Sequence, residues 1–349
     1  MIEPKRFVRD AKCYVPPMEG RRGKIRLDFN ENTWGPSPKV MERLRTLSSE
    51  IISTYPEYQK AYDLFSEKFG IDRSRMLVTN GSDEAIRLTY NAYISPGDKV
   101  VIPVPTFAIF GLEAELFGAN AVEVPYNKDL SFPEDEVIEA SEGARMTIVV
   151  TPNNPTGTSA SLDAIESIAQ RSEVVFVDEA YHEFKGISAL PLIEDYDNII
   201  VTRTFSKAYG LAGLRVGLVF ANEGIIDTLR KVVSPYSVNS IAIECAMAAM
   251  QDQGYMRSCV ERIIQSRERL ASGLRSLGFK VFDSDANFII CDLGKEHKRV
   301  VELLKGEKIL IRDRSGDRLL ENCIRLSAGT MEETEKLLEA LQRNYGDRG

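Results

Sequence analysis

The chain has 349 residues, of which 43% are hydrophobic and 28% are charged, and its formal net charge at pH 7 is −8. These values are typical of a folded, enzyme-sized chain with two domains, and they exclude disordered and fibrous proteins. The acidic balance argues against nucleic acid as a partner, because a phosphate backbone requires a basic face. No apolar run approaches the ~20 residues that cross a bilayer, and the N-terminal segment contains charged residues where a signal peptide would be apolar, so we expect a cytoplasmic protein that binds no membrane.

The cysteines and histidines limit the chemistry that is available. The five cysteines are scattered and form no CxxC pair, and the only histidines are His182 and His297. A multi-histidine metal centre is therefore not expected, and a Ser-His-Asp hydrolase could recruit only these two histidines. We expect reduced cysteines and no metal site.

Short β-branched runs alternate with longer amphipathic stretches from about residue 75 to residue 220, after an irregular first ~30 residues rich in Pro, Gly and basic residues. The strand candidates are Met76–Thr79, Lys99–Ile102, Met146–Val150, Val174–Val177, Ile199–Arg203 and Val216–Phe220. Apolar residues at helical spacing predict helices over Asp83–Ile94, Phe107–Phe117 and Leu162–Ala169. This pattern predicts an α/β core, with a mostly parallel sheet covered by helices on both faces.

After residue 220 the pattern changes to α+β. An apolar helix over Ser240–Met250 precedes a long charged helix over Tyr255–Leu277, which could bridge two domains. The short elements that follow are strands at Lys280–Phe282, Asn287–Cys291, Ile309–Arg312 and Cys323–Leu326, and helices at Lys298–Leu304 and Glu332–Arg343. We predict an N-terminal arm with part of the small domain over residues 1–45, a large domain over 46–250 and a small domain over 251–349.

The strongest local signal is the segment Thr202–Lys207 (TRTFSK), which ends a predicted strand. Its lysine could be no more than a solvated loop cation. However, the hydroxyls of Thr204 and Ser206 and the guanidinium of Arg215 are groups that bind a phosphate, and a lysine beside them can attack an aldehyde. We therefore predict a functional site around Lys207.

A second candidate phosphate site is the segment Gly81–Glu84, which follows a predicted strand and opens a helix. The free N–H groups of Ser82 and Asp83 and the helix dipole suit a phosphate. A plain capping sequence would look the same.

Two more motifs complete a resemblance to the fold-type-I aminotransferases, which depend on pyridoxal 5'-phosphate. The turn Asn153–Gly157 (NNPTG) resembles that family's NNPTG turn, and Val177–Tyr181 (VDEAY) resembles its DEAY strand end. The spacing between these motifs and Lys207 also agrees, and the resemblance extends over almost the whole chain. It implies a large domain with a mostly parallel seven-stranded sheet flanked by helices, and a small α+β domain.

The resemblance also implies a role for each residue. Lys207 would bind the cofactor covalently and then move a proton between substrate and cofactor. Asp178 would keep the ring nitrogen protonated, and Asn154 and Tyr181 would hydrogen-bond the phenolate oxygen. Phe107 would stack on the pyridine ring. Taken singly, Asp178 could be a helix cap, and Tyr181 or Phe107 a core aromatic residue.

Within this fold the chain most resembles the histidinol-phosphate aminotransferases. Lys12–Pro16 (KCYVP) and Leu27–Pro36 (LDFNENTWGP) resemble two segments of that family, and so does Tyr55-Pro56. Ile309–Asp313 and Cys323–Thr330 resemble its two arginine segments.

From these segments the resemblance implies that Asn32, Arg312 and Arg325 bind the substrate together with Tyr14 from the partner subunit. It also implies that Tyr55 reaches the cofactor phosphate of the neighbouring subunit, so that the active form is a homodimer. Cys13, Thr33-Trp34 and Phe107 depart from the family's usual residues, and we expect these departures to touch the substrate-side wall rather than the cofactor.

The predicted function is ping-pong transamination between histidinol phosphate and 2-oxoglutarate, in histidine biosynthesis. One anion site would suffice for both halves of the cycle, because arginine binds phosphate and the carboxylate of glutamate alike. Three alternatives on the same fold stay open: an aromatic-amino-acid aminotransferase, an aminotransferase of another phosphorylated amine, and a decarboxylase of a phosphorylated amino acid. A non-catalytic nucleotide-binding module is disfavoured, because Gly210, Gly213 and Gly217 do not form G-x-G-x-x-G and no P-loop occurs.

Overall fold

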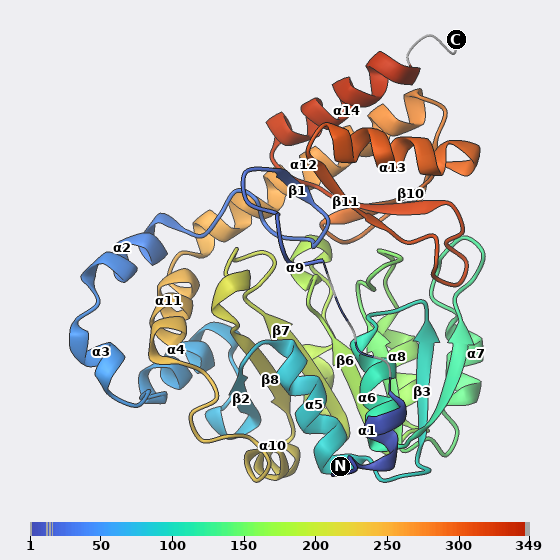
Figure 1. The fold of residues 1–349 in the computed structure, drawn as a ribbon. Helices are drawn as coiled ribbons and strands as arrows, with labels where there is room; N and C mark the ends of the chain where they lie inside the picture. Colours follow the sequence, from blue (N-terminus) through green and yellow to red (C-terminus); the bar gives the residue numbers. More distant parts are fainter. Residues whose placement is uncertain (1, 12, 14, 16, 346–349) are drawn as a thin grey trace.

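Two β-sheets organise the chain in the computed structural model, which describes residues 2–11, 13, 15 and 17–345 (Figure 1). The larger sheet has seven strands in the order β2-β8-β7-β6-β5-β3-β4. Its strands are β2 (Met76–Thr79), β3 (Lys99–Val104), β4 (Asn120–Pro125), β5 (Met146–Val150), β6 (Val175–Asp178), β7 (Ile199–Thr204) and β8 (Gly217–Ala221).

The large sheet is mostly parallel, as predicted. Strands β4, β3, β5, β6 and β7 are parallel to one another, whereas β8 is antiparallel to both β7 and β2. Strands β5 to β8 are buried along their whole length, which explains their continuous apolar runs. Strand β4 was not among the predicted strands. It is a largely exposed edge strand, so its sequence has no such run.

Helices cover both faces of this sheet because successive side chains of each strand point to opposite sides. In β5, Met146 and Ile148 pack in one apolar core, and Val149 packs in the other. The first core includes residues of α5 (Ser82–Tyr93), α6 (Ile109–Phe117) and α10 (Glu223–Arg230). The second includes residues of α2 (Pro38–Thr46), α4 (Gln59–Phe69), α7 (Glu134–Ala140), α8 (Leu162–Ala169), α9 (His182–Lys185) and α11 (Ser240–Met250).

The smaller sheet has five strands in the order β1-β11-β12-β10-β9 and an apolar core of its own. Its strands are β1 (Ile25–Leu27), β9 (Lys280–Val281), β10 (Phe288–Asp292), β11 (Ile309–Asp313) and β12 (Cys323–Ser327). The helices that pack on it are α12 (Gln253–Ser276), α13 (His297–Gly306) and α14 (Met331–Tyr345). Figure 1 shows α12 running from the side of α11 to this upper layer. The domain boundaries at residues 45 and 250 stay predictions.

The N-terminal segment is less irregular than predicted. Residues Ile25–Leu27 pair in parallel with β11, so the start of the chain completes a sheet built from its last third. The short helices α1 (Arg6–Asp10) and α3 (Ser49–Ser53) contain no buried residue. No helix in the described part of the chain is long and apolar enough to cross a membrane.

Candidate functional site

A cavity of about 1360 Å³ lies at the carboxyl ends of the parallel strands. This is the edge at which open α/β sheets bind ligands, because the chain leaves each strand there in a loop. Residues of β11 and β12 and of the segment 18–31 also line the cavity. Twelve of the fifteen predicted site residues line it: Ser82, Asp83, Phe107, Asn154, Asp178, Tyr181, Thr204, Ser206, Lys207, Arg215, Arg312 and Arg325.

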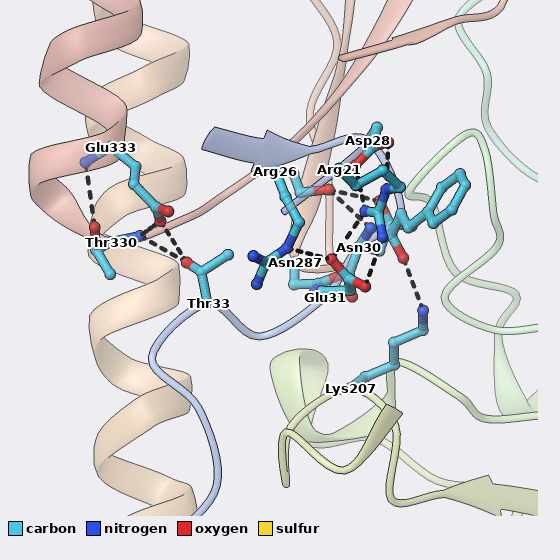
Figure 2. Close-up of polar contacts among 12 residues, drawn as sticks. Arg21, Arg26, Asp28, Asn30, Glu31, Thr33, Lys207, Asn287, Thr330 and Glu333 are labelled. Carbon is cyan, nitrogen blue, oxygen red and sulfur yellow. Dashed lines mark hydrogen bonds and ion pairs between the residues drawn. The ribbon is translucent and has the colours of Figure 1, made fainter. Parts of the chain in front are cut away.

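Lys207 lies three residues beyond the end of β7, and its amine faces the cavity (Figure 2). Its Nζ donates to the carbonyl oxygen of Phe29 at 3.1 Å and lies 5.6 Å from the centre of the Tyr181 ring. Among the described residues no carboxylate forms an ion pair with it. An amine placed in a cavity without a counter-ion is available to react with a bound carbonyl compound.

Asp178 is the last residue of β6 and is almost fully buried. Its Oδ1 accepts from the backbone N–H of Ala180 at 3.1 Å and from the hydroxyl of Thr202 at 3.3 Å. Burial raises the pKa of Asp178 to about 6 even though these hydrogen bonds lower it. A buried carboxylate without an ion-pair partner among the described residues favours a cationic partner in the cavity.

The groups predicted to bind phosphate converge where α5 begins. The N-cap Gly81 has φ of +76° and provides no side-chain cap, so the N–H groups of the first turn face the cavity end. Arg215 donates to the Ser206 hydroxyl at 3.3 Å and pairs with Asp83 at 2.9 Å. A Cβ on Gly217 would lie 2.7 Å from the carbonyl carbon of Gly81, so only glycine permits this approach of β8.

The two asparagines of the NNPTG turn have different environments. Asn153 is fully buried and holds the turn, since its amide donates to the Pro105 carbonyl and to the Thr156 hydroxyl, both at 3.0 Å. Asn154 lines the cavity, and its Oδ1 accepts from Arg325 of β12. The turn therefore positions Asn154 between the large sheet and the small one.

Two arginines of the small sheet stand side by side at the cavity. Arg312 and Arg325 are direct partners in the antiparallel register of β11 and β12. Arg325 is 5% exposed and also donates to the carbonyl of Asp28 at 2.6 Å. The Arg312 guanidinium lies 5.9 Å from the centre of the Phe29 ring. Like charges that face each other across strands destabilise the pair, so this arrangement favours a bound anion.

The sequence reasoning missed the residues with which the N-terminal segment closes one side of the cavity. Arg21 forms bidentate ion pairs with Asp28 and Glu31 and stacks on Phe29, 4.0 Å from the ring centre (Figure 2). Asn30 is 1% exposed and donates to the Tyr181 hydroxyl at 2.9 Å. The asparagine lies in the LDFNEN motif, but no local pattern signals the clamp made by Arg21.

Three predicted residues are not part of this cavity as described. Asn32 is buried outside it, with its amide donating to the Ala208 carbonyl at 2.9 Å and its Oδ1 accepting from the Trp34 N–H at 3.0 Å. Tyr55 is 74% exposed and stacks on Tyr236, with ring centres 4.3 Å apart. Tyr14 lies outside the described residues.

Of the residues at which the chain departs from the family, Phe107 lines the cavity of its own chain, whereas Cys13, Thr33 and Trp34 do not. The Thr33 hydroxyl instead donates to Glu333, which with Thr330 forms the capping box at the start of α14 (Figure 2).

Comparison with known proteins adds an independent line of evidence. The family model described as aminotransferase class I and II matches residues 22–341. Histidinol-phosphate aminotransferase 1 of Trichormus variabilis is 36% identical to this chain, over 94% of the chain and 95% of the relative. The histidinol-phosphate aminotransferase of Roseiflexus castenholzii is 37% identical, over 91% and 89%.

Solved structures are also similar to this chain. The crystal structure of histidinol-phosphate aminotransferase from Sinorhizobium meliloti in complex with pyridoxal-5'-phosphate is similar with a TM-score of 0.90 and 26% identity, covering 100% of this chain and 99% of that one. The L-threonine-O-3-phosphate decarboxylase of Porphyromonas gingivalis shares the fold, with a TM-score of 0.80 and 21% identity over 93% and 100% of the two chains.

Proposed function

The chain belongs to the class I and II aminotransferases, and on that premise we propose that it transfers the amino group of histidinol phosphate to 2-oxoglutarate. The proposed setting is histidine biosynthesis in the cytoplasm. The observation that carries the choice of substrate is the cross-strand pair Arg312 and Arg325 at the cavity that contains Lys207. Such a pair suits a phosphorylated amine in one half-reaction and the distal carboxylate of glutamate or 2-oxoglutarate in the other.

The cavity also fits pyridoxal 5'-phosphate, the cofactor of this family. The buried Asp178 carboxylate would be stabilised by a positively charged partner, and the protonated ring nitrogen of the cofactor would be that partner. Ser206, Arg215 and the first turn of α5 would hold the phosphate, with Thr204 and Asp83 supporting them. Asn154 and Tyr181 would bind the phenolate oxygen. Phe107, which lies edge-on to Phe110, would form a wall against the ring.

When bound, this cofactor supplies an electron sink that stabilises negative charge on the substrate α-carbon. The chain supplies the proton transfer and the binding. Lys207, freed by the incoming substrate amine, would act as the general base for the α-proton of the substrate and then as a general acid. Arg312 and Arg325 would fix the far end of the substrate, so that this proton lies within reach of the lysine amine.

The substrate assignment is tested by single-turnover absorbance changes of the bound cofactor. We expect L-histidinol phosphate to react much faster than phenylalanine, phosphoserine or glutamate, and 2-oxoglutarate to restore the starting spectrum. If another amine reacts faster, the choice of substrate is wrong while the aminotransferase assignment stands. Release of carbon dioxide without consumption of 2-oxoglutarate would identify a decarboxylase instead.

The anion site gives the first prediction. Arg312→Ala should raise the KM for histidinol phosphate about 100-fold, because a charge-assisted bidentate contact worth about 3 kcal/mol is lost. The rate with saturating substrate should change much less, since Arg312 lies away from the reacting bond. Arg318→Ala is the matched control, an exposed arginine that lies outside the cavity lining. Equal KM values for the two variants would remove Arg312 from the site.

We also propose that the enzyme is a homodimer in which Tyr14 and Tyr55 act on the partner subunit's site. Three exposed apolar residues support an interface around α3: Ile52, Tyr55 and Tyr236 are 72%, 74% and 54% exposed. Tyr55 and Tyr236 stack on each other, which keeps the Tyr55 side chain outside its own cavity.

The dimer gives the second prediction. Light scattering should report about twice the chain mass of 39.1 kDa. Tyr55→Phe should stay dimeric but bind pyridoxal phosphate about fivefold more weakly, because one hydrogen bond is worth ~1 kcal/mol. A monomeric wild-type protein, or a Tyr55→Phe variant with unchanged cofactor affinity, would contradict the shared site.

We further propose that residues 46–250 form the cofactor-binding domain, and that residues 251–349 form the small domain together with part of the arm 1–45. The separate apolar cores of the two sheets support this division.

A further inference from the structure

Asn30 joins the small sheet to the cavity wall through four hydrogen bonds. Its N–H donates to the Ser327 Oγ at 2.9 Å, and its Oδ1 accepts from the same hydroxyl at 3.0 Å. Its carbonyl accepts from the Asn287 amide at 3.0 Å, and its own amide donates to the Tyr181 hydroxyl at 2.9 Å. Asn30, Tyr181, Asn287 and Ser327 are all at most 3% exposed.

The direction of these bonds determines what the Tyr181 hydroxyl can do. The Ser327 hydroxyl accepts from the Asn30 N–H and donates its single proton to the Asn30 Oδ1. The carboxamide oxygen therefore faces Ser327 and its nitrogen faces Tyr181. The Tyr181 hydroxyl is an acceptor toward Asn30, and its own proton has no acceptor among the described residues. Tyr181 lines the cavity, so that proton is available to a group bound there.

The backbone of Asn30 supports the same arrangement. Its φ is +55°, in the left-handed region that asparagine tolerates better than most residues. An uncommon backbone conformation held by four hydrogen bonds to three residues is over-determined by its surroundings, a situation that is concentrated at functional sites. The arrangement holds the carboxamide against Tyr181 without any contribution from a ligand.

We propose that Asn30 is a positioning residue that makes Tyr181 a hydrogen-bond donor to the phenolate oxygen of the cofactor. This inference rests on the proposed function, because it requires pyridoxal phosphate in the cavity. A donor to the phenolate disperses its negative charge, and this lowers the pH at which the bound cofactor loses its proton. Asn30 thus affects the protonation of the cofactor through Tyr181. Its own position is fixed by Ser327 of β12 and by Asn287, the residue that precedes β10.

The test is a pH titration of the absorbance of the bound cofactor. Asn30→Asp keeps the shape of the side chain and tolerates the left-handed backbone, but its carboxylate accepts the Tyr181 proton instead of donating to the hydroxyl. The midpoint of the titration should rise by about one pH unit, the shift expected when a single hydrogen bond to the charged form is lost. In a Tyr181→Phe background the same substitution should produce no further shift, because the coupling runs through the hydroxyl.

The matched control is Asn198→Asp. The Asn198 amide is a hydrogen-bond donor as well, to the carbonyls of Ala169 and Ser172, but Asn198 lies at the opposite end of β7 from the cavity. Its titration midpoint should equal that of the wild type. If Asn30→Asp does not fold, Ser327→Ala provides the same test. Loss of the Ser327 hydroxyl frees the Asn30 carboxamide to rotate, and the midpoint of the cofactor titration should shift in the same direction.

The outcomes separate this inference from the function on which it rests. A wild-type protein that gives no cofactor absorbance at all contradicts the proposed function. A wild-type protein that binds the cofactor, with a folded Asn30→Asp variant that titrates at the wild-type pH, contradicts only the role of Asn30. A shift that persists without the Tyr181 hydroxyl, or that Asn198→Asp reproduces, also overturns it.

Discussion

Lys207→Ala should lower transamination by at least about 10⁴-fold, because the variant loses both the covalent attachment of the cofactor and the general base. Lys207 is the only lysine among the described residues that line the cavity, so no neighbouring amine can replace it. Its Nζ contacts a backbone carbonyl rather than a carboxylate, and its removal should leave the fold intact.

The measurement that isolates Lys207 is mass spectrometry of the borohydride-reduced protein. In the wild type, the peptide that contains Lys207 should carry the mass of the cofactor, and in the variant no lysine should carry it. Lys231→Ala, which removes an exposed lysine outside the cavity lining, serves as the control and should label like the wild type. A stably labelled lysine elsewhere in the Lys207→Ala variant would refute the assignment.

Asp178→Asn should reduce turnover about 10³-fold, because a neutral amide cannot keep the ring nitrogen of the cofactor protonated, and a charge pair in a buried site is worth several kcal/mol. The same substitution should stabilise the cofactor-free protein at neutral and alkaline pH. Burial raises the pKa of Asp178 from 3.8 to about 6 in the folded chain, so the folded state binds this proton more tightly than the unfolded state.

The sign of the pH dependence follows from that difference. The destabilisation by Asp178 is absent at pH values below about 4, develops as the pH rises toward 6, and is complete above it. A difference of about two pKa units corresponds to about 3 kcal/mol in the free energy of unfolding. The cofactor-free Asp178→Asn variant should therefore resist urea better than the wild type at pH 8, and the gap should close toward pH 4.

Two comparisons show whether this pH-dependent difference in resistance to urea is specific to Asp178. Desolvation of its carboxyl group also raises the pKa of Glu183 to about 7, but Glu183 is present in both proteins, so its contribution cancels. Asp195→Asn, which changes an exposed aspartate, should leave the urea midpoint unchanged at every pH. A wild type and an Asp178→Asn variant with parallel pH profiles would show that Asp178 is ionised without penalty in the folded chain.

The large sheet and the centre of the site were predictable from local sequence. Buried parallel strands require continuous apolar runs, and the ends of these strands and the turns that follow them contain the Asn154, Asp178 and Lys207 side chains at recognisable spacings. Because the carboxyl ends of parallel strands lie at the same edge of a sheet, assigning the strands was enough to predict that these residues lie close together. The edge strand β4 escaped prediction because one exposed strand needs no apolar run.

Only the tertiary structure decided how the N-terminal segment completes the site. The motif LDFNEN contains two asparagines, and Asn32 was the one predicted to bind the substrate. The left-handed backbone at Asn30 turns that side chain to Tyr181, whereas Asn32 bonds to the Ala208 carbonyl away from the cavity. Side-chain direction after such a residue does not follow from the alternation of a strand.

The sequence by itself determined the buried strands of the large sheet, the turns and the reactive lysine, since each depends on neighbours a few positions away. The partners of the N-terminal segment lie far along the chain: Asn30 bonds to Ser327, and Arg325 bonds to the Asp28 carbonyl. Strand β1 likewise pairs with the distant strand β11: Ile25 is the register partner of Ile309. Contacts of this kind form only when the two sheets are assembled, because local periodicity contains no information about which distant groups meet.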